Sequence, residues 1–279
     1  MDIPNEWHFL SRDNLDLYAR SWPTEGAARG VIVLVHGFAE HMGRYEHVGA
    51  HFAKHGFATY ALDLPGHGKS EGERHIIRSF APHLDAIRQL LDEAKKRGPG
   101  LPVFLIGHSM GGMLVTLLVV TSQPGVAGVV LSGPALPSGA NLGLPSRMMA
   151  KFGKVAPWLP MKPLAAPSVS RDPEVVAAYK ADSLVFRGRL RLGTIRAFVR
   201  AAQRIDRDME KFSLPLFIVH GSEDALAAPA GSERLIARAS STHKALKVYE
   251  GLFHEVFNEP ERDTVLNDVT TWLEARNIP

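Results

Sequence analysis

The pentapeptide Gly107-His-Ser-Met-Gly111 places one serine between two glycines. It follows the short apolar run Val103–Ile106 and precedes the apolar segment Met113–Val120, which predicts a strand, a tight turn and a helix. In such a nucleophile elbow the serine is strained and its hydroxyl stands clear of the sheet, while side chains at positions 107 and 111 would collide with the neighbouring strand and helix. The helix behind the serine directs free N–H groups towards negative charge formed there. Ser109 is therefore a candidate nucleophile, although the pentapeptide alone also fits a glycine-rich turn.

A serine hydroxyl is a weak nucleophile until an adjacent base takes its proton, and histidine suits that role near neutral pH. The chain has 13 histidines, so position must decide between them. His254 lies between the last predicted strand and the last predicted helix, on the same rim of the sheet as Ser109. His220, at the end of another predicted strand, is the one serious rival, whereas His108 should point away from the serine hydroxyl. We expect His254 to be the base.

The imidazole in turn needs a carboxylate that fixes its tautomer and stabilises its cation. Glu223 and Asp224 follow His220 at the end of a predicted strand. The two acids are adjacent, so one should face the histidine and the other solvent, and we expect Asp224 to be the triad acid. The chain order Ser109, Asp224, His254 is that of α/β-hydrolases rather than that of the other serine hydrolase folds.

The tetrahedral intermediate of acyl transfer carries an oxyanion that needs two N–H donors. One donor is the backbone N–H of Met110, the residue after the serine. The other is expected from the loop after the strand Val31–Val35, where Gly37 permits a sharp turn and Phe38 presents its N–H. The alternative interpretation of that loop is an ordinary strand-to-helix turn.

Strands and helices must bring these residues to one rim, and the apolar pattern predicts that the two alternate along the chain. A hairpin is expected from residues 7–10 and 15–22. Further strands are expected at 31–35, 58–62, 103–106, 126–131, 216–220 and 245–249, and helices at 45–55, 80–97, 113–120 and 262–276. This order predicts an α/β fold with a mostly parallel, doubly wound sheet, in which ligands bind beyond the carboxyl ends of the strands.

The pattern changes at Ala135, and from there to about residue 208 we expect no strand. The segment is rich in proline, methionine, glycine and arginine, with helical stretches expected near 146–153, 173–180 and 193–207. We therefore expect residues 1–134 and 209–279 to form the core and residues 135–208 to form a helical cap, or lid, inserted between two strands. An insertion that leaves and re-enters at the carboxyl edge of the sheet would roof the site.

Two features of the expected cap have alternative interpretations. Seven arginines occur between residues 187 and 207, and those at 196, 200, 204 and 207 share one helical face, opposite Ile195, Phe198, Ala202 and Ile205. The arginine face is either a solvated surface or a docking surface for anionic lipid. A methionine-rich apolar stretch forms either cap core or the wall of an acyl-chain tunnel, and consists of Leu142, Leu144, Met148, Met149, Phe152, Val155, Trp158 and Leu159.

The composition narrows the classes of function. A chain of 279 residues with 45% hydrophobic residues can bury a sizeable core, and a formal net charge of +3 is too small to indicate nucleic acid. The lack of cysteine excludes disulfides and a thiolate nucleophile, and no cluster of histidines and carboxylates has metal-ligand spacing, so we expect neither metal nor cofactor. We see no signal peptide and no apolar run near the roughly 20 residues that span a bilayer. We expect a cytoplasmic protein, with peripheral membrane contact through the cap and the oligomeric state left open.

Four segments together resemble the bacterial monoacylglycerol lipases: His36–Glu46, Gly107–Gly112, Ser170–Tyr179 and Tyr249–Glu261. The likeness covers nearly the whole chain, the expected cap included. It implies an α/β-hydrolase fold with a lid, and hydrolysis of monoacylglycerols to glycerol and free fatty acid. The resemblance matches the triad to Ser109, Asp224 and His254, the oxyanion hole to Phe38 and Met110, and the polar, glycerol end of the pocket to Glu40 and Arg44.

Two segments depart from that resemblance. Asp63-Leu-Pro stands where we expect Asp-His-Arg, in a glycine-rich loop that lacks phosphate-binding spacing and that we interpret as structural. Ala225–Pro229 lacks the arginine or lysine that often follows the acid. Both departures bear on substrate preference and leave the triad intact. We expect a serine hydrolase that prefers monoacylglycerol over di- and triacylglycerol; the alternatives are a broad-specificity carboxylesterase or lysophospholipase, and a non-catalytic hydrolase-fold binding protein, which the triad disfavours.

Overall fold

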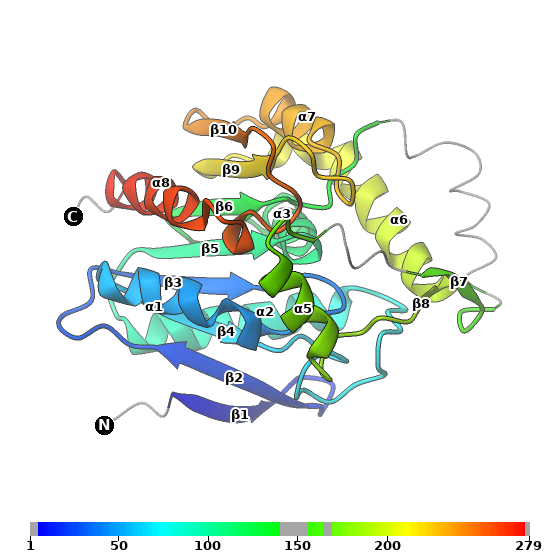
Figure 1. Ribbon diagram of the computed structural model, residues 1–279. Helices are drawn as coiled ribbons and strands as arrows, with labels where there is room; N and C mark the ends of the chain where they lie inside the picture. The colour runs from blue at the N-terminus through cyan, green and yellow to red at the C-terminus, as the bar shows by residue number, and fades with distance from the viewer. Residues whose placement is uncertain (1–4, 140–153, 155, 164–168, 277–279) are drawn as a thin grey trace.

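A computed structural model describes residues 5–139, 154, 156–163 and 169–276 of the chain. Its centre is an eight-stranded sheet (Figure 1). In spatial order the strands are β1 (Glu6–Leu10), β2 (Asp16–Trp22), β4 (Phe57–Leu62), β3 (Gly30–Val35), β5 (Val103–His108), β6 (Gly128–Ser132), β9 (Leu216–Gly221) and β10 (Lys244–Tyr249). From β4 to β10 all neighbours are parallel, whereas β2 is antiparallel to both β1 and β4. The mostly parallel sheet and the N-terminal hairpin predicted from the sequence are confirmed.

The inner strands are buried on both faces, as their continuous apolar sequences predict. Every residue of β3, β5 and β9 is buried, whereas alternate residues of the edge strand β1 are exposed. The parallel register aligns the ends of the inner strands: Val35 lies opposite Gly107, His108 opposite Ser132, and Gly221 opposite Tyr249. The residues that follow these strands therefore meet at one rim of the sheet.

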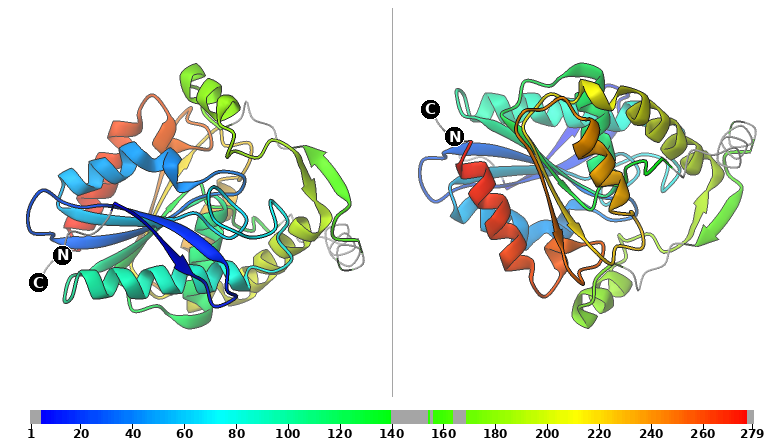
Figure 2. Two further views of the ribbon diagram at one scale, coloured as in Figure 1. Left: turned by 90° about the horizontal axis from the view of Figure 1, so that it is seen from below. Right: turned by 90° about the horizontal axis from the view of Figure 1, so that it is seen from above.

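Helices cover both faces of the sheet (Figure 2). Helices α1 (Glu46–Lys54) and α8 (Arg262–Glu274) pack on one face, and α2 (Ala81–Arg97), α3 (Met110–Ser122) and α7 (Ala230–Arg238) on the other. The sequence pattern predicted all of them except α7. The apolar face predicted for α2 is buried throughout, and consists of Phe80, Leu84, Ile87, Leu90, Leu91 and Ala94. In the part of the chain that the structure describes, no helix combines the length and the apolar character needed to cross a membrane.

The expectation that residues 135–208 contain no strand is wrong. Two short strands, β7 (Pro160–Pro163) and β8 (Arg189–Arg191), pair in antiparallel fashion. Strands of four and three residues are too short to show an alternating pattern, and prolines at both ends of β7 argue against a strand. The helices predicted near 173–180 and 193–207 are confirmed as α5 (Pro173–Ala181) and α6 (Leu192–Asp208), whereas the stretch 146–153 lies outside the described residues. Figure 1 shows α6, β7 and β8 beyond the edge at which β3 ends.

The glycine-rich loop after β4 is closed by its own carboxylate. Asp63 accepts hydrogen bonds from the backbone N–H groups of Met42 and Lys69, each at 2.8 Å. The Ser70 hydroxyl donates to the Asp63 carbonyl at 2.6 Å. These bonds tie the loop to the 3₁₀ turn η1 (Met42–Tyr45). Such ties are what the interpretation of the loop as structural predicts.

Candidate active site

Ser109 stands at the turn between β5 and α3 with a left-handed φ of 52°. A non-glycine residue rarely adopts this conformation, and the surrounding bonds hold it: the Ser109 N–H donates to the Ser132 carbonyl at 3.0 Å. A Cβ atom at position 107 would lie 2.6 Å from the Gly111 carbonyl oxygen, and one at position 111 would collide with the Val35 carbonyl oxygen. The steric reason that the sequence predicted for both glycines is therefore confirmed.

Ser109, His254 and Asp224 form a continuous hydrogen-bonded chain. The His254 Nε2 atom lies 2.9 Å from the Ser109 Oγ atom, and its Nδ1 atom lies 2.7 Å from Asp224 Oδ2. The other oxygen, Asp224 Oδ1, accepts from the N–H groups of Leu226 and Ala227, each at 2.8 Å. Burial raises the pKa of Asp224, but the hydrogen bonds from the two neighbouring histidines outweigh it, so its pKa lies well below the ordinary value. Asp224 is therefore ionised wherever His254 could act as a base.

The other candidates for the acid and the base lie elsewhere. Glu223 is exposed, so of the two adjacent acids Asp224 faces the histidine. His220 bonds to Asp224, Ala227 and Ser232 rather than to Ser109. These positions leave His254 and Asp224 as the pair that reaches the serine.

His108 follows the prediction that its side chain avoids the serine hydroxyl. Its Nδ1 atom lies 3.2 Å from the Ser132 Oγ atom. Burial, followed by the proximity of His254, lowers the pKa of His108 to about 4, so the ring is neutral near pH 7. A neutral ring here places no second cation beside His254.

The loop after β3 lies against the serine. A Cβ atom on Gly37 would lie 3.2 Å from the Ser109 Cβ atom. The His36 ring joins this loop to the segment after β4. Its Nδ1 atom lies 2.7 Å from the Gly37 carbonyl oxygen, and its Nε2 atom accepts a hydrogen bond from the Leu64 N–H at 2.9 Å. Burial lowers the pKa of His36 to about 3, so this neutral tautomer persists at ordinary pH. These contacts hold the loop against Ser109.

Phe38 and Met110 are the two residues whose backbone N–H groups the sequence predicts as oxyanion donors. Met110 is the first residue of α3, and the first N–H groups of a helix have no acceptor within the helix. Phe38 lies in the loop that contacts Ser109 and lines the same cavity. The neighbouring Gly37 N–H donates to Glu40 Oε1 at 2.6 Å, which ties the loop to Glu40.

A buried ion cluster supports this loop from the other side. Arg44 Nη1 donates to Glu40 Oε2 at 2.6 Å and to Glu255 Oε1 at 2.7 Å, and Arg44 Nη2 donates to Glu255 Oε2 at 2.6 Å. The Tyr45 hydroxyl donates to Glu40 Oε1 at 2.7 Å, and the Arg44 guanidinium lies 4.7 Å from the centroid of the Tyr179 ring. Burial raises the pKa of Glu40, but the charge of Arg44 outweighs it and the pKa lies below the ordinary value. The cluster connects the loop after β3 directly to Glu255, the residue after His254.

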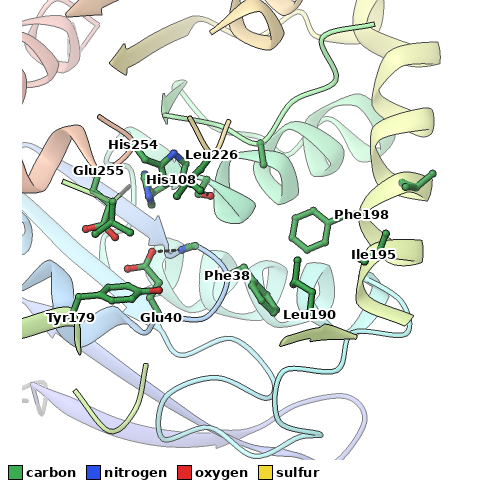
Figure 3. A pocket seen from close by; sticks show the side chains of 15 residues that line it. Phe38, Glu40, His108, Tyr179, Leu190, Ile195, Phe198, Leu226, His254 and Glu255 are labelled. Carbon is green, nitrogen blue, oxygen red and sulfur yellow. Dashed lines mark hydrogen bonds between the residues drawn. The ribbon is translucent and has the colours of Figure 1, made fainter. Parts of the chain in front are cut away.

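A cavity of about 320 Å³ opens onto the serine and histidine (Figure 3). Its two ends differ in chemistry. The polar end carries Glu40, Tyr179 and Glu255, and the apolar end carries Leu190, Ile195 and Phe198. Glu40 lines the cavity as the sequence suggested, whereas Arg44 lies behind it. Within the described ranges, no group of three or more histidine, aspartate or glutamate side chains is arranged to hold a metal ion.

Sequence reasoning missed several of these residues. Glu255 directly follows His254, and that adjacency was the available signal. Tyr179 ends one of the segments that carried the family resemblance. For Leu190 no signal existed, because its place depends on the pairing of β8 with β7.

Comparison with known proteins assigns the chain to a family. Residues 26–261 match the Hydrolase_4 family, described as serine aminopeptidase, S33. The chain belongs to this S33 family. It is 44% identical to the monoacylglycerol lipase of Mycolicibacterium smegmatis, with 90% of each chain covered, and 32% identical to the monoglyceride lipase of Homo sapiens, with 99% of this chain and 91% of that protein covered.

Solved structures agree with this S33 assignment. The monoacylglycerol lipase of Paleococcus ferrophilus matches with a TM-score of 0.82 at 30% identity, over 93% of this chain and 99% of that chain. A soluble variant of the monoglyceride lipase of Saccharomyces cerevisiae matches with a TM-score of 0.86 over 100% of this chain and 97% of that chain; at 21% identity this supports the fold alone. The α/β-hydrolase fold and the resemblance to bacterial monoacylglycerol lipases are therefore confirmed.

Proposed function

We propose that this S33-family protein is a carboxylic ester hydrolase that cleaves monoacylglycerols to glycerol and free fatty acid. The observation that carries the proposal is the asymmetry of the cavity around Ser109, which offers polar groups at one end and apolar side chains at the other. A monoacylglycerol has the same asymmetry about its ester bond. The identity of 44% to a protein named monoacylglycerol lipase supports the same substrate class.

The reaction follows from the hydrogen-bonded chain. Ser109 Oγ attacks the ester carbonyl carbon while His254 Nε2 takes its proton, and the carbonyl oxygen becomes an oxyanion that the N–H groups of Phe38 and Met110 bind. Collapse of this intermediate breaks the bond to the glycerol oxygen, which receives the proton from His254. A water molecule then gives a proton to His254 and attacks the acyl-serine. The second collapse breaks the bond to Ser109 Oγ, which receives the proton from His254, and releases the fatty acid. Asp224 remains ionised and stabilises the His254 cation throughout.

The polar end of the cavity is proposed to recognise the free hydroxyls of glycerol. Glu40, Tyr179 and Glu255 line that end, and Glu40 is our candidate for a direct contact. Arg44 is our candidate for holding the carboxylates of Glu40 and Glu255 in place from behind the lining. A site built to bond such hydroxyls rejects a substrate that lacks them, because its own polar groups stay buried and unpaired. A second acyl chain would both remove a hydroxyl and demand space. At the other end, apolar burial favours longer chains by roughly 0.8 kcal/mol per methylene until the space is filled.

A fluorophosphonate probe tests the chemistry. We expect rapid covalent labelling of a single serine, mapped by mass spectrometry to Ser109, and no labelling of Ser109→Ala. A non-catalytic binding protein would remain unlabelled. Labelling says nothing of the alcohol, so kcat/KM for a monoacylglycerol should then be compared with that for the methyl ester of the same fatty acid. A marked preference for the glycerol ester supports glycerol recognition, whereas equal values would indicate a broad carboxylesterase.

We also propose that residues 135–208 act as a cap that contacts anionic membranes. On α6 the apolar face packs as expected, with Ile205 fully buried and Phe198 and Ala202 against the core, while Arg200 and Arg204 are exposed on the opposite face. Near β7 the side chains of Trp158 and Leu159 are 63% and 47% exposed, and Arg191 bonds to the Trp158 carbonyl. Exposed apolar side chains beside arginines are typical of a surface that docks on anionic lipid.

Vesicle binding tests this contact. The triple variant Arg196→Gln, Arg200→Gln and Arg204→Gln should bind anionic vesicles more weakly than the unaltered protein. Added salt should produce the same loss, because exposed charges are screened beyond about 8 Å at physiological ionic strength. The control is a second triple variant that removes equal charge from other elements: Arg12→Gln, Lys96→Gln and Arg262→Gln. Equal binding to neutral and anionic vesicles would leave the arginine face as a solvated surface.

A further inference from the structure

His220 is a buried histidine that contacts the same carboxylate oxygen of Asp224 as His254 does. It lies near the end of β9 and is fully buried. Its Nε2 atom lies 3.0 Å from Asp224 Oδ2 and 2.7 Å from the Ala227 carbonyl oxygen. Its Nδ1 atom lies 2.8 Å from the Ser232 Oγ atom on α7. Both ring nitrogens are thus engaged, and the mechanism above uses neither.

These contacts determine the tautomer of His220. A bare ring nitrogen cannot face two oxygen acceptors, so Nε2 carries the hydrogen and donates to Asp224 and Ala227. The Ser232 hydroxyl, 2.8 Å from Nδ1, can then donate to that nitrogen. Asp224 Oδ2 therefore accepts one hydrogen bond from His220 and one, at 2.7 Å, from His254. Two imidazoles share a single carboxylate oxygen.

We propose that His220, oriented by Ser232, is a positioning residue that directs the Asp224 carboxylate towards His254 and moderates its basicity. The inference rests on the proposed function, because it assigns His220 a role in the same triad. Asp224 Oδ1 is held by two backbone N–H groups, and His220 supplies the corresponding restraint on Oδ2. Without that restraint the carboxylate could rotate away from the line joining it to His254 and Ser109.

Loss of the His220 donor has a predictable effect on pH dependence. Each hydrogen bond to a carboxylate stabilises its charge, so a carboxylate that loses a donor attracts the His254 proton more strongly. The acid limb of the kcat/KM pH profile should therefore move to higher pH. The other groups near His254 are the Ser109 hydroxyl, the His108 ring at a centroid distance of 4.8 Å, and the Glu40–Arg44–Glu255 cluster. None of them changes in the variants below.

The experiment compares His220→Leu with His220→Gln on p-nitrophenyl acetate, a small ester that needs no glycerol recognition. A glutamine amide N–H can take the place of the Nε2–H donor, whereas leucine cannot. We expect His220→Leu to lower kcat about tenfold or more and to raise the acid limb by about half a pH unit or more. His220→Gln should recover most of both losses. Ser232→Ala, which removes the donor to Nδ1, should shift the limb in the same direction by less.

A matched control is His83→Leu, the same substitution at another buried histidine outside the triad. It should leave the acid limb in place. Should His220→Leu fail to fold, the glutamine variant and Ser232→Ala still carry the test through their pH profiles. The inference is overturned if the unaltered protein hydrolyses the ester normally and these variants lose only stability, with kcat and the acid limb unchanged. The proposed function would then still stand. An unaltered protein that hydrolyses no ester overturns both.

Discussion

Replacing Arg44 with methionine should destabilise the protein by about 3–5 kcal/mol, because the change leaves buried carboxylates without their cation. The side chain of Arg44 is 10% exposed, and those of Glu40 and Glu255 are 3% and 5% exposed. Methionine retains much of the apolar stem, so the loss reports the charge rather than the packing. The matched control is Arg78→Met. Arg78 makes two hydrogen bonds of 3.0 Å to Glu73, but these side chains are 59% and 47% exposed, so the loss of stability should be far smaller than that of Arg44→Met.

Urea unfolding at two pH values measures both costs and tests the cause. In Arg44→Met, burial of Glu40 is no longer offset by the Arg44 charge, so the folded pKa of Glu40 should lie above the unfolded value of about 4.3. This destabilisation is then fully present above the raised folded pKa and is relieved as the pH falls through it. The cost of Arg44→Met, relative to the unaltered protein at the same pH, should therefore be smaller at pH 5 than at pH 8. Equal costs for Arg44→Met and Arg78→Met, or a cost independent of pH, would refute the reasoning.

Three further changes test other parts of the structure. Asp224→Asn should cut kcat by about 10⁴ with the fold intact, whereas Glu223→Gln, at an exposed position, should change it little; steady-state kinetics would reveal a reversed ranking. Gly111→Ala should lower stability by about 3 kcal/mol in thermal unfolding, because its Cβ meets the Val35 carbonyl oxygen; an unchanged Tm would contradict the steric account. Burial lowers the pKa of His83 to about 3, so below about pH 6.5 the unfolded histidine gains a proton that the folded one does not. Folding stability should therefore fall by up to about 1.4 kcal/mol for each pH unit below that point. In His83→Leu this contribution is absent, so urea unfolding should show a smaller loss of stability between pH 7.5 and pH 5 than in the unaltered protein. An equal loss in the two proteins would contradict the reasoning.

The central sheet could be predicted because burial on both faces leaves a strong signal in the sequence. The continuous β-branched run of β3 and the single apolar face of α2 each specify one kind of element. The positions that follow the parallel strands could be predicted as well, because such strands end at a common rim. Ser109, Asp224 and His254 each lie just beyond a strand end, so the sequence alone predicts that they lie close together.

What could not be predicted depends on contacts between distant segments. The pairing of β7 with β8 joins two strands of four and three residues that are 25 residues apart, and neither shows a period. The nine-residue helix α7 was missed, although α1 and α5 have the same length and were predicted. Arg44 was expected at the glycerol end of the pocket, yet its bonds to Glu40 and Glu255 place it behind the pocket wall. No local pattern encodes an ion pair between Arg44 and Glu255, which are 211 positions apart in the sequence.

The central claim, hydrolysis of monoacylglycerols by Ser109, is tested most directly by kcat/KM across mono-, di- and triacylglycerols of the same acyl chain. The substrates should be presented below their aggregation limits, so that the comparison reports recognition rather than interfacial packing. Ser109→Ala measures the background. The account predicts that the monoacylglycerol is clearly preferred and that Ser109→Ala shows no turnover above background. Triacylglycerol hydrolysed as efficiently as the monoester would contradict it and would indicate a general lipase instead.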